Sequence, residues 1–414
     1  MGMEILVISN GHGEDVIAVS IAEALRQFPE ITKISALPLV GKGYAYEKAN
    51  IPIIGTAKTM PSGGFNQDIK QMGRDLNDGL LTLTYHQYQI IKQWGKNGGK
   101  ILAVGDILPL LFAWLSGGEF AFVGTAKSEY YLRDETGWLA STSLLERWLG
   151  SMYFPWERWL MNRSACCGVF VRDSLTAKIL GEFSIPVYDL GNPMMDHFSV
   201  NPSLTFPPET EPLIILLLPG SRMPEAQNNW QLILQAVDSI KAVFSQRSLL
   251  FLAAITPSFN SIPFQEDLVD NSWQKEWINT YNLSIPDEQG ILFSREQERL
   301  IISQQAYQTC LQLSHIGIAM AGTATEQFVG LGKPVISFPG NGPQFTQKFA
   351  QNQTRLLGCS VTLVDRPQEV GHTLTQLIKD PKKLKNIADN GQKRLGKPGA
   401  AQRIANCVVN ECFN

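Results

Sequence analysis

The sequence predicts an α/β protein built from two Rossmann-like domains, and three observations support this prediction. Short apolar runs alternate with helical patterns along both halves of the chain. Glycine-containing polar loops follow several of these runs, as they do at the strand-to-helix turns of doubly wound sheets. Between the halves lies a proline-rich segment that is typical of a linker, with Pro202, Pro207, Pro208 and Pro212.

The length of the chain also favours two domains, because 414 residues exceed what one ordinary hydrophobic core holds. We expect an N-terminal domain over residues 1–197 and a C-terminal domain over residues 210–398. A final helix within residues 400–414 is expected to pack back on the first domain.

Composition narrows the class of protein. A hydrophobic content of 44% is typical of a folded soluble protein, and a net charge of -3 gives no reason to expect a nucleic-acid partner. No apolar run approaches a membrane span in length, and the chain opens with a strand rather than a signal segment. The six cysteines lack zinc-ligand spacing, and the five histidines form no HxxxH pair. We therefore expect a cytoplasmic protein with no metal and no resident cofactor.

In the first half, apolar runs predict buried parallel strands at residues 4–8, 34–39, 100–106, 120–124 and 168–171. Helical patterns follow through Leu25, over residues 76–94 and over residues 174–180. Parallel sheets of this kind bind their ligands at the carboxyl ends of the strands. The loops at these ends are therefore where we look for a site.

The first such loop carries Gly11, His12, Gly13, Glu14 and Asp15. It lacks the third glycine of a dinucleotide fingerprint and the Gly-Lys-Ser/Thr ending of a P-loop. The histidine and the two acids are able to move or hold protons where a bound substrate would lie. We predict catalytic roles for His12 and Glu14, and substrate contacts for Gly11, Gly13 and Asp15. In the alternative, Asp15 caps the helix and the other side chains are solvated.

A further acid, Asp106, ends the strand over residues 100–106 and lies at the same rim of the sheet as His12. Two interpretations stay open for this carboxylate. It is either a catalytic or substrate-contacting group, or it caps the helix that follows.

Residues 138–160 contain four of the nine tryptophans, with Arg147, Arg158 and Arg163 among or just after them. Aromatic rings beside arginines suit a surface that meets lipid headgroups, which would make the protein peripheral on a membrane. In the alternative, these rings fill a core between helices.

In the second half we expect strands at residues 213–218, 249–255, 290–294 and 360–364, and a helix over residues 298–313. Residues 316–340 read as strand, helix and strand, with the helix starting at Thr323 and Gly332 ending it. The positive end of this helix suits a phosphate or diphosphate, and Glu326 could accept hydrogen bonds from a ribose diol. The alternative is an ordinary buried βαβ unit, in which Glu326 is merely favourable at a helix start. A further anion-binding loop, with Ser221 and Arg222, follows the strand over residues 213–218.

Together these features resemble the GT-B glycosyltransferase architecture, in which two Rossmann-like domains face each other across a cleft. The chain looks like a relative of lipid-A-disaccharide synthase over nearly its whole length. The motifs that carry the likeness are Leu217 to Arg222, Gly322 to Glu326, and Gly191-Asn192-Pro193.

The resemblance implies roles for individual residues. It assigns the donor diphosphate to Ser221, Arg222, Gly322, Thr323 and Ala324. It also assigns Glu326 to the ribose, Gln344 and Gln347 to the donor sugar, Asn192 to substrate binding and Asp106 to catalysis. The loop over residues 10–15 departs from the synthase pattern, as does the length of the Trp-rich stretch, so the donor class carries over better than the acceptor.

The leading hypothesis from the sequence is a metal-independent, inverting transfer of a sugar from a nucleotide-diphosphate donor to a lipid or amphipathic acceptor. Uridine is what the resemblance implies for the base of the donor. Asp106 is the first candidate base, with Glu14 and His12 behind it. Two alternatives stay open: a UDP-sugar 2-epimerase, which shares the fold, and a nucleotide-sugar-binding protein without catalysis.

Overall fold

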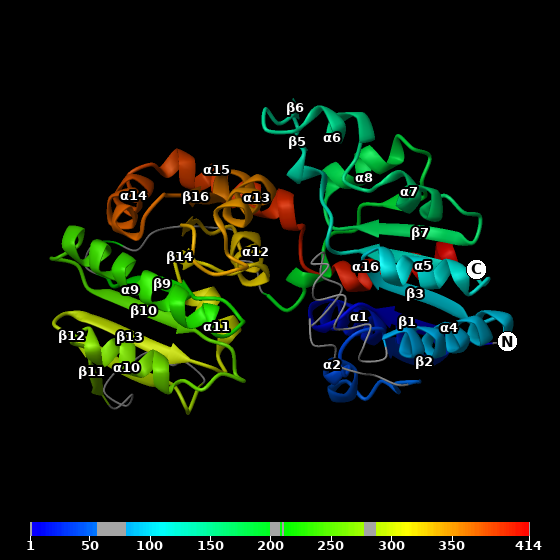
Figure 1. Ribbon diagram of the computed structural model, residues 1–414, viewed down its shortest axis with the longest axis horizontal. Helices are drawn as coiled ribbons and strands as arrows, with labels where there is room; N and C mark the ends of the chain where they lie inside the picture. Colours follow the sequence, from blue (N-terminus) through cyan, green and yellow to red (C-terminus); the bar gives the residue numbers. More distant parts are fainter. Residues whose placement is uncertain (1, 56–79, 199–207, 209–210, 277–286, 414) are drawn as a thin grey trace. The chain divides into compact units, whose positions relative to one another are not determined.

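The computed structural model describes residues 2–55, 80–198, 208, 211–276 and 287–413 (Figure 1). The chain divides into two compact units, one formed by residues 1–197 with 396–414 and the other by residues 198–395. Each unit is built around its own largely parallel sheet with helices on its faces. The α/β fold class predicted from the sequence is confirmed.

The N-terminal unit holds a six-stranded parallel sheet in the order β2-β1-β3-β4-β7-β8. Its strands are β1 (Met3–Ser9), β2 (Ile31–Pro38), β3 (Lys100–Gly105), β4 (Phe120–Gly124), β7 (Cys166–Val171) and β8 (Val187–Tyr188). Along β1, Ile5 and Val7 enter one hydrophobic core while Leu6 and Ile8 enter another. The sheet is therefore buried on both faces, as its unbroken apolar runs require.

Helices cover both faces of this sheet (Figure 1). Those of this unit are α1 (His12–Leu25), α2 (Tyr44–Lys48), α4 (Leu80–Lys96), α5 (Ile107–Leu115), α6 (Leu144–Leu149), α7 (Pro155–Met161), α8 (Ser174–Gly181) and α16 (Ala400–Cys407). The last of them packs beside α1, and the amides of Ala400 and Ala401 donate to the carboxylate of Asp196 at 2.9 and 2.7 Å. A π-helical turn, Val408–Cys412, follows it.

A smaller excursion leaves this unit between β4 and β7. It consists of a 3₁₀ turn, Glu129–Tyr131, the two-stranded ribbon β5 (Arg133–Asp134) and β6 (Gly137–Trp138), and then α6 and α7. Figure 1 shows β5, β6 and α6 at one end of the unit, beyond the edge of the helices that cover the sheet.

The C-terminal unit holds an eight-stranded sheet in the order β11-β12-β13-β10-β9-β14-β15-β16. Its strands are β9 (Leu213–Leu218), β10 (Leu249–Ala254), β11 (Gln274–Glu276), β12 (Ile291–Arg295), β13 (Glu298–Ser303), β14 (Ile316–Ala319), β15 (Val335–Ser337) and β16 (Val361–Leu363). Its helices are α9 (Glu225–Val243), α10 (Ile262–Asp270), α11 (Tyr307–Leu313), α12 (Thr323–Gly330), α13 (Gln347–Leu357), α14 (Val370–Ile378) and α15 (Pro381–Leu395). Six strands run parallel, and β11 and β12 extend one edge in antiparallel pairing.

The predicted helix over residues 298–313 is wrong in its first half. Residues 298–303 form β13, which pairs with β10 and β12, and the helix begins only at Tyr307. Three consecutive buried residues, Leu300, Ile301 and Ile302, suit a strand that is covered on both faces. The Asp287 carboxylate then accepts from the amides of Gln304 and Gln305, which turns the chain before α11.

Part of the prediction lies outside the described residues. This holds for residues 76–79 of the expected long helix, whose described part is α4, and for Pro202 and Pro207 of the expected linker.

Candidate functional site

Three neighbouring strands of the C-terminal unit bring three loops to one edge of its sheet. Strands β9, β14 and β15 are adjacent, and the loops that leave them begin at Pro219, Met320 and Phe338. The amide of Met320 donates to the carbonyl oxygen of Leu218 at 2.8 Å, so the first two loops start side by side. This is the edge at which open parallel sheets bind ligands.

The first loop depends on a glycine. Gly220 has φ of 110°, and a Cβ atom at this position would lie 3.2 Å from the carbonyl oxygen of Met320. The close approach of the second loop and the positive φ both favour glycine. Ser221 and Arg222, which follow, are exposed at this edge, as predicted contacts to a diphosphate need to be.

The second loop leads into α12, which begins at Thr323 as the sequence predicts. Its N-cap is Gly322, which has no side chain, so no side chain caps this end of the helix. The Thr325 hydroxyl turns inward and donates to the carbonyl oxygen of Ala321 at 2.6 Å. Helix N-termini favour anions through their terminal N–H groups and their dipole. Glu326 lies in the first turn of the same helix and is half-buried.

The third loop, residues 338–346, is held by a carboxylate on α9. The Glu225 Oε1 atom accepts from the amides of Gln344 and Phe345 at 3.1 and 2.6 Å. One turn later, the Asn229 side-chain amide donates to the carbonyl oxygen of Pro219 at 3.0 Å. The start of α9 thus ties the first loop to the third. Gln344 is exposed in this loop, and Gln347 is exposed at the first position of α13.

A buried amide supports the second loop in the same way. Gln353 on α13 donates to the carbonyl oxygens of Ala321 and Gly322 at 2.8 and 3.3 Å. Sequence reasoning missed Glu225, Asn229 and Gln353. The spacing of Glu225 and Asn229, four residues apart at a helix start, was a signal that both lie on one helix face.

In the N-terminal unit, the loops after β1 and β3 lie against each other. Gly105, at the end of β3, has φ of 136°, and a Cβ atom there would lie 3.1 Å from the Cβ of Asn10 and 3.4 Å from the Cγ of Glu14. The structure therefore brings Glu14 next to the segment that carries Asp106, as expected from strand ends at one rim. Both acids are half-buried rather than enclosed.

Asp106 is the N-cap of α5, and its Oδ1 atom accepts from the amide of Leu108 at 3.0 Å. The capping interpretation of this residue is thus observed in the structure. A cap uses one carboxylate oxygen, so it is compatible with a second role for the same group at the rim. The catalytic role stays a prediction.

Asp15 is more enclosed than the sequence suggests, with 1% of its surface exposed. The Ser9 hydroxyl donates to its Oδ1 atom at 2.5 Å, and the Tyr46 hydroxyl donates to Ser9 at 2.6 Å. Burial raises the pKa of Asp15 to about 7, with the nearby Glu14 carboxylate acting in the same direction and the Ser9 bond opposing it. The N-cap of α1 is Gly11, so Asp15 does not cap this helix.

The other predicted residues of the loop after β1 differ in their exposure. Gly11 is buried and Gly13 is exposed. His12 is the first residue of α1, and its side chain lies outside the described part of the structure.

Asn192, predicted from the resemblance to bind substrate, is buried and has a local structural role. Its Oδ1 atom accepts from the amide of Met194 at 3.1 Å and caps the 3₁₀ turn Pro193–Met195. The neighbouring Gly191 has φ of 88° and packs against the segment that leads into α16. The motif therefore joins the last helix to the first unit.

The side chains of the Trp-rich stretch differ in burial. Tyr153, Leu160 and Met161 enter the core beneath the sheet. In contrast, Trp148, Trp156 and Trp159 are exposed. The core interpretation is therefore wrong for these three tryptophans.

Two general properties complete the description. Among the described residues, no cluster of three or more His, Cys, Asp or Glu side chains is arranged to hold a metal ion. The same residues contain no helix with the length and apolar character needed to cross a bilayer.

The fold defines the class of protein: two Rossmann-type units of the kind found in GT-B-like proteins. No family model matches the sequence, and no curated protein matches it. Solved structures do match over nearly the whole chain, and they are described next.

A putative UDP-N-acetylglucosamine 2-epimerase from Listeria monocytogenes matches with a TM-score of 0.58 and 13% identity, covering 99% of this chain and 96% of that one. The UDP-GlcNAc 2-epimerase of Neisseria meningitidis, solved with UDP-GlcNAc bound, gives a TM-score of 0.54 and 16% identity, covering 98% and 100%. MurG of Acinetobacter baumannii gives a TM-score of 0.56 and 12% identity, covering 98% and 99%. At these identities the likeness shows the fold.

These matches correct the function expected from the sequence. UDP-GlcNAc 2-epimerases recur among the similar structures, which favours the epimerase alternative over sugar transfer to a lipid acceptor. The physical reason for the error is that epimerases and a glycosyltransferase such as MurG share this fold, so the fold pattern in a sequence does not separate the two reactions. The lipid acceptor was implied by the resemblance to lipid-A-disaccharide synthase, and a shared fold does not decide between the two reactions. A relationship to lipid-A-disaccharide synthase in particular is not shown.

Proposed function

We propose that this protein is an enzyme that binds a UDP-sugar and inverts carbon 2 of the sugar, as a UDP-GlcNAc 2-epimerase does. The observation that carries this proposal is the set of three loops at β9, β14 and β15, which present backbone and cationic groups suited to a diphosphate. Whole-chain likeness to the UDP-GlcNAc-bound epimerase of Neisseria meningitidis supports the choice of donor.

In this proposal, Arg222, Ser221 and the N-terminal end of α12 hold the diphosphate. The guanidinium supplies positive charge and paired donors, and the helix end supplies N–H groups from Gly322, Thr323 and Ala324. Glu326 accepts from the ribose, and Gln344 and Gln347 contact the sugar. Glu225, Asn229 and Gln353 are positioning residues, because each is buried and bonds to the backbone of a loop.

Inversion at carbon 2 requires proton handling, because the hydrogen on that carbon must leave from one face and a proton must return to the other. The C2–H bond has no adjacent carbonyl. The electron pair is therefore taken up as a C1–C2 double bond forms and the C1–O bond to the diphosphate breaks. The loops of the C-terminal unit stabilise the charge on that leaving group and retain it. When a proton is added to carbon 2 from the opposite face, the double bond is consumed and an oxygen of the retained diphosphate forms the bond to C1 again. We assign the proton steps to the rim acids Asp106 and Glu14, with His12 beside them in the chain.

The test is an incubation of the protein with UDP-GlcNAc in deuterated water, followed by proton NMR. Epimerisation predicts loss of the carbon-2 proton signal as deuterium enters, together with signals of the 2-epimer or of free UDP. Binding of the donor without exchange at carbon 2 would contradict the proposal and leave a nucleotide-sugar-binding protein without this catalysis.

A further inference from the structure

Large apolar side chains gather on one small part of the N-terminal unit. Six of the sixteen that are exposed in the described residues lie between residues 144 and 159. They are Leu144, Leu145, Trp148, Phe154, Trp156 and Trp159. We call these six residues the α6–α7 patch. Isolated exposed apolar side chains are ordinary, whereas a cluster marks a surface that meets something.

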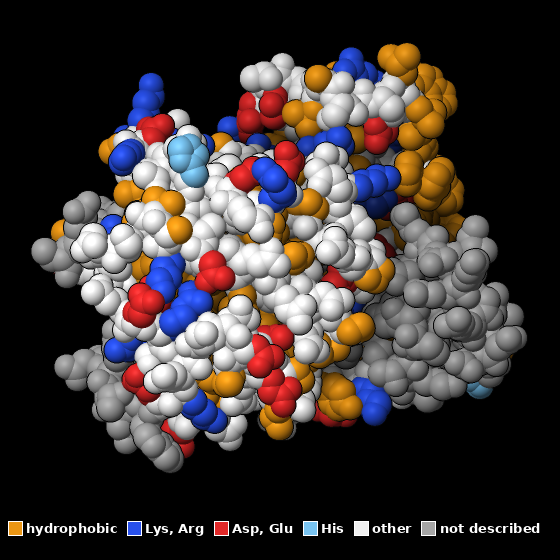
Figure 2. Space-filling view, turned by 60° about the vertical axis from the view of Figure 1, so that its left-hand side comes forward, with side chains coloured by type: hydrophobic (Ala, Val, Ile, Leu, Met, Phe, Trp, Pro, Cys, Tyr) orange, Lys and Arg blue, Asp and Glu red, His pale blue; other side chains and the backbone are white. Residues whose placement is uncertain are grey.

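The helix α6 carries the most exposed part of the patch and has no buried residue. Leu144 is 84% exposed, Trp148 80% and Leu145 66%. A helix that packs on its own domain buries an apolar stripe, and this one presents its apolar side chains outward instead. In Figure 2, hydrophobic side chains gather along the upper right-hand edge of the molecule with lysine and arginine side chains beside them, at the height where α6 stands in Figure 1.

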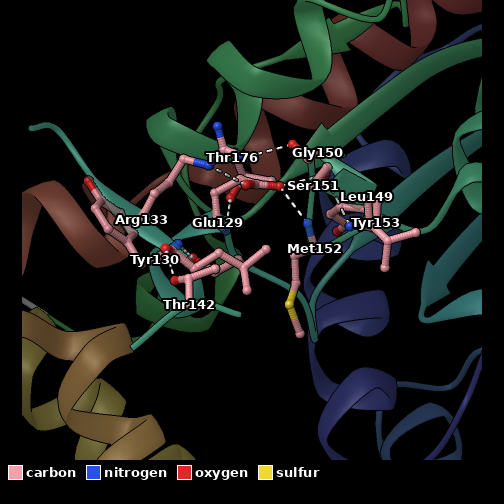
Figure 3. A network of polar contacts seen from close by, with 12 residues as sticks. Glu129, Tyr130, Arg133, Thr142, Leu149, Gly150, Ser151, Met152, Tyr153 and Thr176 are labelled. Carbon is pink, nitrogen blue, oxygen red and sulfur yellow. Dashed lines mark hydrogen bonds and ion pairs between the residues drawn. The ribbon is translucent and has the colours of Figure 1, made fainter. Parts of the chain in front are cut away.

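The exposed position of α6 is fixed by its surroundings, because a polar network around the buried Glu129 holds the C-terminal end of the helix (Figure 3). Glu129 is fully buried, and it accepts from the Ser151 hydroxyl and from the amide of Met152 at 2.8 Å. Its other oxygen pairs with the Arg133 guanidinium at 3.0 Å. That guanidinium also donates to the carbonyl oxygen of Gly150, the residue that ends α6.

Further contacts fix the same segment. A capping box of Ser143 and Glu146 starts α6, and the Arg158 guanidinium donates to the carbonyl oxygen of Leu149 at its end. The Thr142 hydroxyl donates to the carbonyl oxygen of Leu132, one residue before β5. Rigid support of this kind is expected when exposed apolar side chains serve a contact.

The charged side chains on or just after the two helices are three arginines and two acids. Arg147, Arg158 and Arg163 lie on or beside the two helices, and the Arg163 guanidinium stacks on the Trp159 ring at 4.2 Å. The two acids of the same helices are bonded at the helix starts: Glu146 is used in the capping box of α6, and the buried Glu157 pairs with Lys127 and caps α7. The surface that remains combines indole rings, leucines and guanidinium groups.

We propose that the α6–α7 patch docks the protein on an anionic lipid bilayer. Indole rings favour the boundary between headgroups and acyl chains, leucines enter the acyl region, and arginines pair with lipid phosphates. The positive charge at the rim of the patch favours anionic lipid over a neutral partner. This inference is independent of the reaction at the strand ends.

The experiment is cosedimentation with vesicles of phosphatidylcholine, with and without phosphatidylglycerol, alongside quenching of tryptophan emission by brominated lipid. The wild-type chain should bind the anionic vesicles, bind less at raised salt, and be quenched. The double substitution Leu145→Glu and Trp148→Glu should weaken binding by more than about tenfold, because two side chains that enter the bilayer become charged.

Val269→Glu is the matched control, since Val269 is 58% exposed on α10 of the other unit. It should bind as the wild type does. Circular dichroism and thermal melting report whether the double variant folds, and none of its positions is buried. No binding to anionic vesicles would overturn the proposal, as would equal binding of the double variant. A wild-type dimer in solution that the double variant converts to a monomer would assign the patch to a second copy of the chain instead.

Discussion

The two units present different chemistry at the carboxyl ends of their strands. In the N-terminal unit the strand ends carry carboxyl groups. Asp106 caps a helix, and the buried Asp15 accepts from the Ser9 hydroxyl, which itself accepts from the Tyr46 hydroxyl. In the C-terminal unit they carry glycines, hydroxyls and a guanidinium, and the carboxylate of Glu225 is turned into the loops as an acceptor for amides. We propose that the same sheet architecture supports proton handling in one unit and anion binding in the other, and each substitution below tests one side of this contrast.

The largest effect is expected from Asp106→Asn. Asparagine caps helices as well as aspartate does, so the melting temperature should stay nearly constant. Turnover of UDP-GlcNAc should fall by about 10²- to 10⁴-fold if this carboxylate handles the proton. Asp380→Asn is the matched control, because Asp380 accepts from the amide of Lys383 at the start of α15 and plays no part in the proposed reaction. Full activity of Asp106→Asn would move the base elsewhere.

The next effect is the pH dependence of stability that Asp15 gives the N-terminal unit. Its pKa in the folded chain, about 7, lies above the ordinary value of 3.8, so the folded state keeps the proton after the unfolded state has lost it. Stability should therefore fall as pH rises from about 4 to about 7 and level off above that. Asp15→Asn should remove this slope and raise the unfolding free energy at pH 8 by about 2–4 kcal/mol, measured by urea titration. An unchanged slope in the variant would show that Asp15 ionises normally.

In the C-terminal unit, Glu225→Ala should cost about 2–3 kcal/mol of unfolding free energy, because the amides of Gln344 and Phe345, of which the second is buried, lose their acceptor. Binding of UDP, measured by calorimetry, should weaken with it, since the third loop loses its support. Glu225→Gln keeps an acceptor oxygen at the same place and should recover most of both losses. If the alanine variant binds UDP with wild-type affinity, this loop is not part of the donor site.

The smallest effect is expected from Arg222→Ala. Arg222 is exposed, so its removal should leave the melting temperature unchanged. Affinity for UDP should fall by about tenfold, because one charge-assisted contact to the diphosphate is lost. Uridine, which has no phosphate, should bind both forms equally. An equal loss of affinity for uridine and for UDP would mean that the guanidinium does not contact the diphosphate.

The sequence predicted best what depends on short-range pattern. The bounds of β4 and β9 were predicted to the residue, because each is an uninterrupted apolar run between polar turns. The start of α12 at Thr323 was predicted from a different local signal, namely threonines that follow an apolar run and suit a helix start. The helix predicted over residues 298–313 was wrong in its first half because short apolar runs suit helix and strand alike. The pairing of β13 with β10 decided between them.

The contacts that build the candidate site were beyond local pattern. Glu225 and Gln344 are 119 residues apart, and their bond exists only because β9 and β15 belong to one sheet. Asp15 was predicted to contact substrate or, in the alternative, to cap a helix, since nothing in its own segment shows that Tyr46 and Ser9 cover it. Burial of a polar side chain is a tertiary property, so the sequence showed the acid but not its pKa.

Amide hydrogen exchange with and without UDP-GlcNAc tests the central claim most directly, because it locates the donor on the chain. The account predicts slower exchange at residues 220–222, 320–326 and 340–346, the three loops of the C-terminal unit. Protection confined to other segments, or no protection at donor concentrations that saturate binding, would contradict it.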